Sequence, residues 1–437
     1  MKPIVFLTSG TLGDVQPTTA LARGMQDAGH VVRVAAPPAF RKLIEAQSLP
    51  FAALEGNPSD LLTEPGRQSA LTFDNNPLVG IKSTLGYLRA ARPVYAQMIG
   101  NGWRVSQGAS ALVIGLPTIW ATSIAEALEI PHIGAFLQPV TSTEEFPSPL
   151  LPSALRLGRA YNKFTYWLTT LAVYLPWRGA INRWRRHSLG LKPLQVFHQS
   201  FEKMDAILYG FSEKVVPCPK DWPGNQVVTG YWSLKAESFT PPPELQHFIQ
   251  SGKPPFYFGF GSPGMFEPRR LTELLIRSIE KAGIRAVLSL PGHINLQTQN
   301  EKIFIQRRNV PHDWLFPRMA GVVHHGGAGT TAAALMAGVP TFIAPLAVDQ
   351  FFWGERVHAL GVGPRAVPQR ALTEEKLEDA LNEMKGWRVK EAAQKLGEQL
   401  RRENGVLEAV RVMESILETG PDLGRRPERN GGERRIS

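Results

Sequence analysis

The stretch that decides the fold of this chain reads Val322-Val323-His324-His325-Gly326-Gly327-Ala328-Gly329-Thr330-Thr331 and is followed by the pair Asp349-Gln350. Valines lead into two histidines, and small residues then open an alanine-rich segment that ends at Gly338. The pattern predicts a strand, a glycine-rich turn and the first turn of a helix. Main-chain N–H groups and the positive end of the helix would both point at the turn, which suits an anion such as a diphosphate.

Four residues of this turn are candidate phosphate ligands: His325, Gly327, Gly329 and Thr330. His325 stands last before the glycines and can add one directional donor, although a histidine packed in the core at a strand end is the alternative. The glycines leave room for phosphate groups because they carry no side chain. His324 falls on the opposite face of the strand, since side chains alternate along a strand, and is expected to pack.

The next loop brings two further polar groups to the same edge of the predicted sheet. A short apolar strand begins at Thr341, and the loop after it ends in Asp349 and Gln350. Ligands of open α/β sheets bind at this edge, and a carboxylate beside an amide there suits a nucleotide-sugar. Asp349 could also cap the helix predicted from Phe351 to Ala359, and both roles can hold together.

The run from Val310 to Val357 resembles the donor-binding signature of family 1 glycosyltransferases, which use nucleotide-sugars and have the GT-B fold. The matching segments are Pro311-His312-Asp313-Trp314-Leu315-Phe316-Pro317, His324 to Thr331, and Asp349-Gln350-Phe351-Phe352-Trp353-Gly354-Glu355-Arg356-Val357. The amino-acid sequence of these segments most resembles that of sterol 3-beta-glucosyltransferases and their bacterial relatives. Glycopeptide and macrolide glycosyltransferases come next.

The resemblance implies an α/β protein with two Rossmann-like parallel-sheet domains that face each other across a cleft. It also implies a C-terminal helix that crosses back to the N-terminal domain. Asp349 and Gln350 would hold sugar hydroxyls, Ser262 would donate to a phosphate, and Val310 would lie near the nucleobase. Plant members begin their motif with a tryptophan, and this chain has Asn309 and Val310 there instead. The resemblance therefore does not decide between uridine, thymidine and guanosine as the nucleoside of the donor.

A second motif follows the first predicted strand and reads Ser9-Gly10-Thr11-Leu12-Gly13-Asp14-Val15-Gln16-Pro17. Related sequences read Gly-(Ser/Thr)-Arg-Gly-Asp-(Val/Ile)-(Gln/Glu)-Pro here, which implies that Asp14 is the general base. The acceptor loop would then be Gly10, Thr11, Leu12 and Gly13, with Leu12 in place of the usual arginine. An ordinary Asp, with a pKa of about 3.9, is a weak base for an alcohol unless burial raises that value. The alternative is a cap for a helix that starts near Pro17.

The composition is that of a globular protein of two domains. The chain has 437 residues, of which 43% are hydrophobic and 20% charged. The N-terminus does not read as a signal peptide and Cys218 is the only cysteine, so a cytoplasmic location is the expectation. No metal-ligand spacing accompanies the donor motif, so we expect no metal and no cofactor besides the nucleotide-sugar co-substrate. The spacing of Gly10 and Gly13 does not match a dinucleotide fingerprint.

Most of the net charge of +10 lies between Leu151 and Ser200, which hold eight basic and no acidic residues. Trp167, Leu168, Leu171 and Leu175 are spaced as one helical stripe within this stretch. A solvated basic face, a lid over an apolar acceptor, and a helix on an anionic membrane surface all remain open. In the membrane case, three arginines would lie at the surface and Trp184 would insert; the arginines are Arg183, Arg185 and Arg186. Nucleic acid is not expected, because no recognised motif accompanies the charge.

The alternation of predicted strands and helices indicates two α/β domains. The expected limits are 1–238 for the acceptor domain, 239–254 for a linker, 255–405 for the donor domain, 406–419 for the crossover helix, and 420–437 for a disordered basic tail. A single last helix is predicted from Lys390 to Leu417. The insertion from Asn57 to Met98 is expected to shape a substrate cleft with loops and helices.

The leading hypothesis is an inverting, metal-independent glycosyltransferase that moves a hexose to a hydroxyl of an apolar acceptor. Glucose from UDP-glucose is the first choice of donor, and a sterol or another lipid alcohol is the first choice of acceptor. A macrolide, a flavonoid or another secondary metabolite is the rival acceptor. A nucleotide-sugar-binding protein without turnover is the rival of another class, and the presence of both Asp14 and His325 argues against it. Peripheral contact with an anionic membrane surface is a further expectation, from the basic and aromatic stretch between Leu151 and Ser200.

Overall fold

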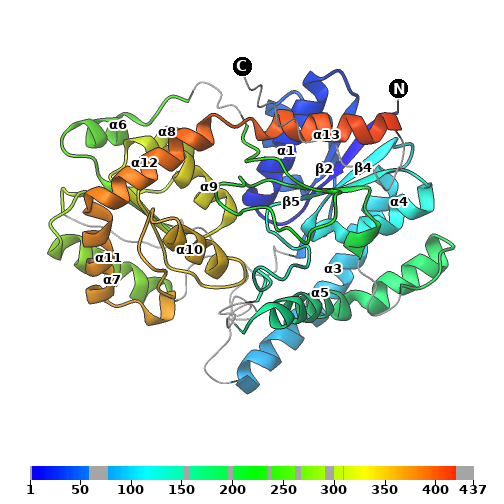
Figure 1. The fold of residues 1–437 in the computed structure, drawn as a ribbon, viewed down its shortest axis with the longest axis horizontal. Helices are drawn as coiled ribbons and strands as arrows, with labels where there is room; N and C mark the ends of the chain where they lie inside the picture. Colours follow the sequence, from blue (N-terminus) through cyan, green and yellow to red (C-terminus); the bar gives the residue numbers. More distant parts are fainter. Residues whose placement is uncertain are drawn as a thin grey trace, which may run out of the picture.

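The computed structural model describes residues 2–58, 77–151, 157–194, 200–234, 239–260, 267–290, 300–308 and 310–419. Within them two parallel sheets form two halves of the molecule (Figure 1). The strands of the N-terminal sheet are β1 (Ile4–Leu7), β2 (Val32–Ala36), β3 (Phe51–Ala53), β4 (Ala111–Gly115), β5 (His132–Phe136), β6 (Ala206–Tyr209) and β7 (Gln226–Val228). Those of the C-terminal sheet are β8 (Phe256–Gly259), β9 (Ala286–Ser289), β10 (Ile303–Gln306), β11 (Gly321–His324) and β12 (Thr341–Ile343).

Thirteen α-helices connect and cover these strands in the described part of the chain. They are α1 (Leu12–Asp27), α2 (Arg41–Ala46), α3 (Pro77–Val105), α4 (Thr122–Leu128), α5 (Arg159–Ser188), α6 (Pro243–Gln250), α7 (Pro268–Lys281), α8 (His312–Leu315), α9 (Ala328–Ala337), α10 (Gln350–Ala359), α11 (Glu374–Lys385), α12 (Trp387–Arg401) and α13 (Gly405–Thr419). The central strands are buried along their whole length, as expected for parallel sheets with helices on both faces.

The strand order places the candidate site at one edge of each sheet. The N-terminal order is β3-β2-β1-β4-β5-β6-β7, and the C-terminal order is β10-β9-β8-β11-β12. The order reverses between β1 and β4 in the first sheet and between β8 and β11 in the second. Ligands of doubly wound sheets bind at such switch points. The loops after β1 and β11 carry the two sequence motifs, so the topology assigns both motifs to switch points.

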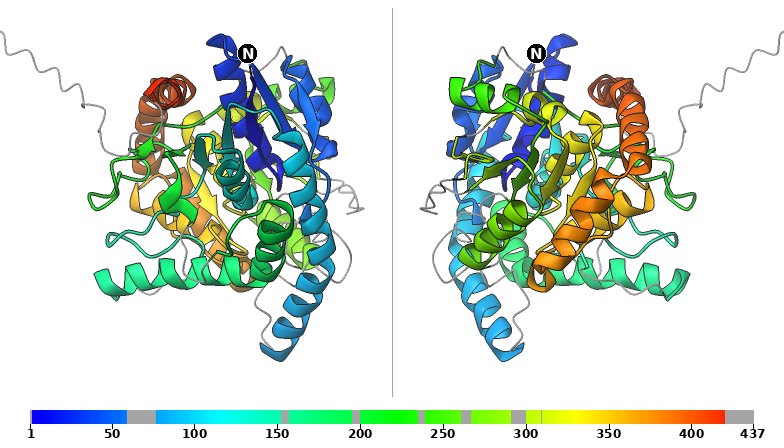
Figure 2. Two further views of the ribbon diagram at one scale, coloured as in Figure 1. Left: turned by 90° about the vertical axis from the view of Figure 1, so that its right-hand side faces the viewer. Right: turned by 90° about the vertical axis from the view of Figure 1, so that its left-hand side faces the viewer.

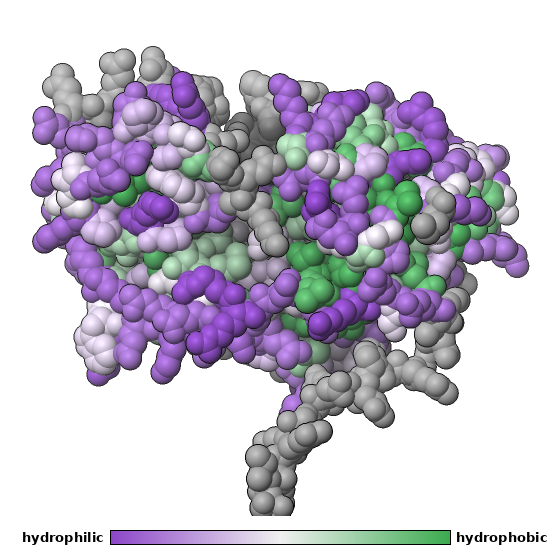
Figure 3. Space-filling view, turned by 90° about the horizontal axis from the view of Figure 1, so that it is seen from above, coloured by the Kyte–Doolittle hydropathy of each residue, from purple (hydrophilic) through white to green (hydrophobic). Residues whose placement is uncertain are grey.

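The C-terminal helix crosses back to the N-terminal half, as the resemblance implied. Figure 1 shows α12 in the C-terminal half and α13 beside α1. Gly24 of α1 permits this packing, because an added Cβ would lie 2.4 Å from the Val406 side chain. The His30 Nε2 atom also lies 3.0 Å from the Glu414 Oε1 atom across the two helices. The face seen from above is largely hydrophilic, with hydrophobic residues gathered mainly over the N-terminal half (Figure 3).

Two helix limits predicted from the sequence are wrong. The helix expected near Pro17 begins five residues earlier, at Leu12, because the Asp14 carboxylate accepts from the Thr11 N–H and closes the first turn. The single helix expected from Lys390 to Leu417 is two helices, because the chain must pass close to Gly230. A Cβ on Gly405 would lie 2.4 Å from the Gly230 carbonyl carbon, so the main chains touch where α13 begins. The limits expected for the domains and the linker stay predictions.

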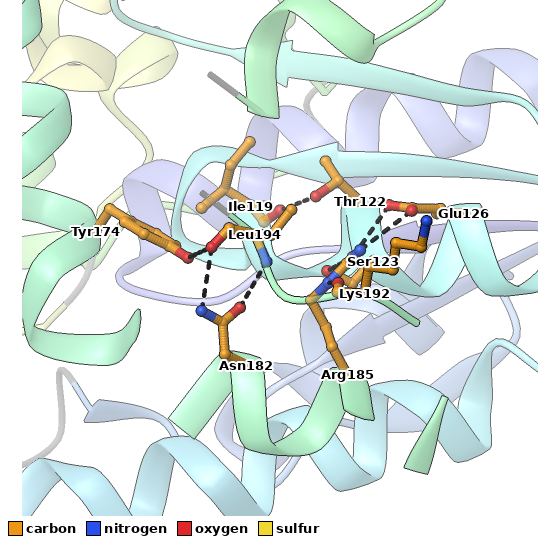
Figure 4. A network of polar contacts seen from close by, with 9 residues as sticks. All are labelled: Ile119, Thr122, Ser123, Glu126, Tyr174, Asn182, Arg185, Lys192 and Leu194. Carbon is orange, nitrogen blue, oxygen red and sulfur yellow. Dashed lines mark hydrogen bonds and ion pairs between the residues drawn. The ribbon is translucent and has the colours of Figure 1, made fainter. Parts of the chain in front are cut away.

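The basic stretch forms α5, and its C-terminal half is anchored in the fold by a network of polar contacts (Figure 4). The buried Arg185 guanidinium donates to both carboxylate oxygens of Glu126 in α4, at 3.0 and 3.1 Å, and to the Ser123 Oγ atom at 2.8 Å. Asn182 exchanges two side-chain hydrogen bonds with the main chain of Leu194. The expectation of a surface position is therefore wrong for Arg185, although Arg183 and Arg186 are exposed.

Two of the three tryptophans of this stretch are also part of the packed structure. Trp177 stacks on Tyr95 of α3 with ring centroids 4.4 Å apart, and Trp184 meets Trp120 edge-on at 6.4 Å. The expectation that Trp184 inserts into a membrane is therefore wrong, whereas Trp167 is exposed. Among the described residues, no helix combines the length and the apolar character that crossing a bilayer requires.

The position of Arg185 predicts a large loss of stability on substitution. Arg185→Met should lower the free energy of unfolding by about 2–4 kcal/mol, because it removes a bidentate ion pair and leaves Ser123 and the Lys192 carbonyl without their donor. Arg186→Met, one residue further on an exposed position, should change it by less than about 0.5 kcal/mol. Chemical denaturation of both variants measures the difference, and equal midpoints would show that the network does not anchor α5.

Candidate active site

The conformation of the glycine-rich turn between β11 and α9 is fixed by Gly326 and by His324. Gly326 has a φ of 96°, and a Cβ there would lie 2.7 Å from the Ile343 side chain, so glycine is required. The Gly326 N–H donates to the Nδ1 atom of buried His324 at 3.0 Å. His324 therefore packs beneath the turn, as its place on the strand predicted, and also fixes the conformation of the turn. The helix then begins after Gly327, with its first N–H groups facing outward.

His325 stands at the rim of this turn and is a neutral imidazole at neutral pH. Burial lowers the pKa of His325 to about 4, and the Gly259 carbonyl at the end of β8 partly offsets that effect. Its Nε2 atom faces Gly327, where an added Cβ would approach it to 2.8 Å. The Nδ1 atom is buried. The ring is thus aimed at the N-terminus of α9, the position from which it could bind a phosphate oxygen.

The loop before α10 presents the predicted carboxylate and amide on a strained backbone. Val348 has a φ of 52°, which is unfavourable for a β-branched residue and is typical of functional loops. Asp349 stands at the N-cap, but its carboxylate accepts from the indole N–H of Trp353 at 3.0 Å instead of capping the helix. The Gln350 Oε1 atom accepts from the N–H groups of Leu346 and Ala347, which directs its NH₂ group away from the loop.

Asp14 lies in the first turn of α1, and Gly10 leaves room for its carboxylate. Its Oδ2 atom accepts from the Thr11 N–H at 2.8 Å and from the Thr11 hydroxyl at 3.0 Å. Gly10 has a φ of 106°, and a Cβ there would lie 2.5 Å from the same oxygen. Burial raises the pKa of Asp14 to about 6, the hydrogen bonds from Thr11 oppose the rise, and the charge of Asp349 adds to it. The cap and a basic carboxylate therefore coexist in one residue.

The fold brings the two motifs together across the two halves. A Cβ built on Gly329 would lie 3.8 Å from the Gly13 Cα atom, so the N-termini of α1 and α9 meet. Asp14 and Asp349 are close enough for their charges to interact. Gln138, two residues after β5, donates from its Nε2 atom to the Asp349 Oδ2 atom at 3.0 Å. Burial raises the pKa of Asp349, and this bond opposes the rise. The predicted base and the predicted sugar ligand thus share one site.

For the remaining predicted residues, the structure gives either the burial of the side chain alone or no description. Thr330 is half-buried in the first turn of α9, and Leu12 is exposed beside Asp14. Val310 is buried in a cluster with Leu245 and Tyr257, so little of its side chain is available to a nucleobase. Ser262, Asn309 and the tail from 420 to 437 lie outside the described residues, as does part of the expected insertion, from 59 to 76. In the described ranges, no three His, Cys, Asp or Glu side chains gather as metal ligands would.

Sequence reasoning missed three residues that shape the site. Gln138 follows β5 without any motif, and only the sheet order brings it to Asp349. Trp353 is buried in α10 and donates its indole N–H to the Asp349 carboxylate, a role that the matching segment did not indicate. Asn57 is buried and donates from its Nδ2 atom to the Gly10 carbonyl at 3.1 Å, which fixes the loop after β1. The one available signal was the position of Gln138 at the C-terminal end of a central strand.

Comparison with known proteins agrees with this arrangement. Residues 4–147 match the model of the glycosyltransferase family 28 N-terminal domain, and residues 289–415 match the erythromycin biosynthesis protein CIII-like C-terminal domain. Sterol 3-beta-glucosyltransferase UGT80A2 of Arabidopsis thaliana is 37% identical over 94% of this chain and 64% of its own length. Sterol 3-beta-glucosyltransferase of Leptosphaeria maculans is 35% identical over 98% of this chain and 30% of its own length. The chain thus spans less than two thirds of these relatives.

Two solved structures share the fold at low sequence identity. The glycotransferase of kitacinnamycin superposes with a TM-score of 0.67 at 17% identity, over 95% of this chain and 98% of that one. Spinosyn forosaminyltransferase SpnP gives 0.65 at 15% identity, over 95% and 99%. Two Rossmann-like sheets that meet at a glycine turn and a crossover helix define a GT-B protein. The chain therefore has the GT-B fold, and over nearly its whole length its sequence is similar to those of sterol 3-beta-glucosyltransferases.

Proposed function

We propose that this protein transfers glucose from UDP-glucose to the hydroxyl of a sterol or a similar lipid alcohol, with inversion at the anomeric carbon and without a metal. The observation that supports it best is the meeting of Asp14 with Asp349 beside His325 and the N-terminus of α9. The proposed base, the proposed sugar ligand and the proposed phosphate site then lie around one binding site. The extended similarity to sterol glucosyltransferases supports the choice of acceptor and donor.

The proposed reaction is a single displacement. The acceptor oxygen attacks the anomeric carbon as the bond from that carbon to the diphosphate oxygen breaks, which inverts the configuration and releases UDP. The acceptor proton passes to the Asp14 carboxylate. A pKa of about 6 leaves this carboxylate ionised at neutral pH and makes it a stronger base than an ordinary aspartate. Asp349 and the Gln350 amide would hold sugar hydroxyls and fix the reacting carbon relative to Asp14.

In this proposal the leaving diphosphate is stabilised by the protein itself. The N-terminus of α9 supplies free N–H groups and a positive partial charge, and His325 supplies a ring nitrogen beside them. Donors fixed in place before reaction cost no reorganisation as charge develops on the leaving group. This is the role that a divalent cation plays in other transferases.

An acceptor panel tests the proposed function. With UDP-glucose as donor, we expect the purified protein to glucosylate a 3β-hydroxysterol in detergent faster than a flavonoid, a macrolide or water. Product mass identifies the acceptor, and the anomeric proton coupling in an NMR spectrum gives the stereochemistry. Release of UDP without a glucoside, or a preference for a polar aglycone, would contradict the acceptor. Because a sterol dissolves in bilayers, the same acceptor makes contact with an anionic membrane surface part of this proposal.

Metal independence gives a separate expectation. Treatment with excess EDTA, followed by desalting, should leave the rate of glucosyl transfer unchanged, because the positive potential at the diphosphate comes from α9 and His325. Initial rates with and without added Mg²⁺ measure the effect. A loss of activity that Mg²⁺ restores would show that a cation takes part in leaving-group stabilisation.

A further inference from the structure

The N-terminal half of α5 has its amphipathic character reversed. Its buried face carries Tyr166 and three smaller polar side chains, and each of the three has a hydrogen bond to the loop before the helix. The Asn162 amide donates to the Glu144 carbonyl at 2.7 Å, and the Thr165 hydroxyl accepts from the Ser148 N–H at 2.8 Å. The Thr169 hydroxyl lies 2.9 Å from the Ser148 hydroxyl. A helix of a globular protein normally buries its apolar face. A helix that buries polar side chains and exposes apolar ones is therefore expected to meet an apolar phase on its exposed face.

The outward face carries those apolar residues. Of the ten exposed large hydrophobic side chains in the described part of the chain, four are spaced along one face of α5 and a fifth stands two residues before the helix; they are Phe164, Trp167, Leu168 and Leu175, with Leu157 ahead of them. We name this set the α5 apolar face. Its two aromatic rings stack on each other with centroids 5.5 Å apart. Isolated exposed apolar residues are ordinary, but a contiguous patch of this kind marks an interaction surface.

Positive charge surrounds the α5 apolar face. The sequence from Leu157 to Ser188 contains six basic residues and no acidic one. Arg159 and Lys163 lie at the start of the helix and share Glu144, and the Arg159 side chain remains 86% exposed. Arg183 and Arg186 are exposed near its end. A tryptophan and aliphatic residues flanked by cations match the interface of a bilayer with anionic headgroups, where rings insert and cations stay at the surface.

One loop connects this face to the active site. The loop between β5 and α5 contains Gln138, which binds Asp349, and Phe146, which packs on Phe352 of α10 with ring centroids 5.6 Å apart. The same loop contacts the buried polar face of α5 through Ser148. Figures 1 and 2 show α5 along the lower edge of the N-terminal half, away from the crossover helix. A surface on which α5 lies would therefore be joined to the site by a single loop.

We propose that the α5 apolar face docks on an anionic lipid bilayer, with Phe164, Trp167 and Leu168 inserted among the headgroups and the basic residues of α5 at the phosphate level. The apolar side chains supply most of the binding, and the cations supply the preference for anionic lipid. Only the role of this docking rests on the proposed function: docking would place the acceptor end of the site at the membrane that holds the sterol.

Vesicle flotation of the full chain tests the proposal. Wild-type protein should float with phosphatidylcholine vesicles that contain phosphatidylserine, less with phosphatidylcholine alone, and the difference should shrink at high salt. The combined change Phe164→Ser, Trp167→Ser and Leu168→Ser should lower the partition coefficient about 100-fold or more on both vesicles. Arg183→Gln with Arg186→Gln should lower it about fivefold for each charge, on anionic vesicles only.

Matched controls separate docking from general stickiness and from misfolding. Trp387 is 68% exposed in α12, outside the α5 apolar face, so Trp387→Ser should leave flotation unchanged. Wild-type melting temperatures for all variants would show that the fold survives. The proposal is overturned if wild type binds neither vesicle, or if the triple serine variant floats like wild type. A dimer that the serine variant abolishes, without vesicle binding, would assign the face to a second copy and would also overturn it.

The experiment is independent of the proposed reaction. Flotation needs no donor and no turnover, so it can succeed with a protein that glucosylates nothing. Glucosyl transfer to a sterol in detergent needs no bilayer, so the triple serine variant should keep the wild-type rate there and lose rate only when the sterol is supplied in vesicles. Failure in detergent alone would count against the reaction, and failure in flotation alone would count against the docking surface.

Discussion

Asp14→Asn should abolish most of the proposed glucosyl transfer while leaving donor affinity at the wild-type value. The amide keeps the shape of the carboxylate and can still accept one hydrogen bond from Thr11, so the first turn of α1 should persist. It cannot take a proton from the acceptor hydroxyl. General-base catalysis contributes about 10²–10⁴ in rate, so kcat should fall about 100-fold or more. Single-turnover rates together with calorimetric binding of UDP separate the two quantities.

The raised pKa of Asp14 gives this variant a second signature. Because the folded state holds the Asp14 proton more tightly than the unfolded state, wild-type stability falls as the pH rises from the ordinary aspartate range to about 6. Asp14→Asn removes that cost, so its melting temperature should exceed the wild-type value at pH 7, and the gap should close at pH 4. In wild type, kcat/KM should fall below about pH 6, where Asp14 becomes protonated.

A matched carboxylate on the same helix serves as the control. Asp27 ends α1 on the surface, where it pairs with Arg23, so Asp27→Asn should change neither rate nor pH profile. Unchanged transfer in Asp14→Asn would assign the base to another group. Reduced activity with a lowered melting temperature at pH 7 would mean that Asp14 acts only as a cap for the helix.

The parts of the fold that follow local rules could be predicted from the sequence. The strands at Ala111–Gly115 and His132–Phe136 are short, mainly apolar runs, and Pro131 directly before the second run marks where that strand can begin. The glycine turn before α9 was predictable because valines favour a strand, glycines favour a turn and alanines favour a helix. The crossover of the last helix came from family resemblance, since no local rule indicates which half a terminal helix packs against.

What could not be predicted depends on contacts between distant segments. The break between α12 and α13 arises where Gly405 passes the main chain of Gly230, and no pattern in either segment signals that meeting. Arg185 looks like Arg183 and Arg186 in the sequence, yet a helical turn places it against Glu126 in the interior. The role of Gln138 likewise depends on the order of strands in the sheet and on the approach of the second half.

His325→Ala should weaken donor binding and slow transfer together. The phosphate acceptor carries charge, so the hydrogen bond from His325 should be worth about 1.5–3 kcal/mol, equivalent to about 10–150-fold in affinity or rate. Because charge on the diphosphate grows as UDP departs, the loss in kcat should be at least as large as the loss in donor affinity. UDP binding by calorimetry and kcat with saturating donor measure the two losses, and His187→Ala on exposed α5 is the control.

The protonation state of the imidazole makes a finer test possible. With a pKa of about 4 in the ligand-free protein, His325 reaches the diphosphate as a neutral ring unless the phosphate charge draws in a proton. His325→Gln supplies a neutral donor of similar reach. If the neutral ring suffices, the glutamine variant should recover most of the affinity lost by alanine, and UDP binding should release the same heat in buffers of different ionisation enthalpy. If binding draws in a proton, the measured heat should vary with the buffer and glutamine should recover little. Wild-type affinity and rate in His325→Ala would remove the ring from the diphosphate site altogether.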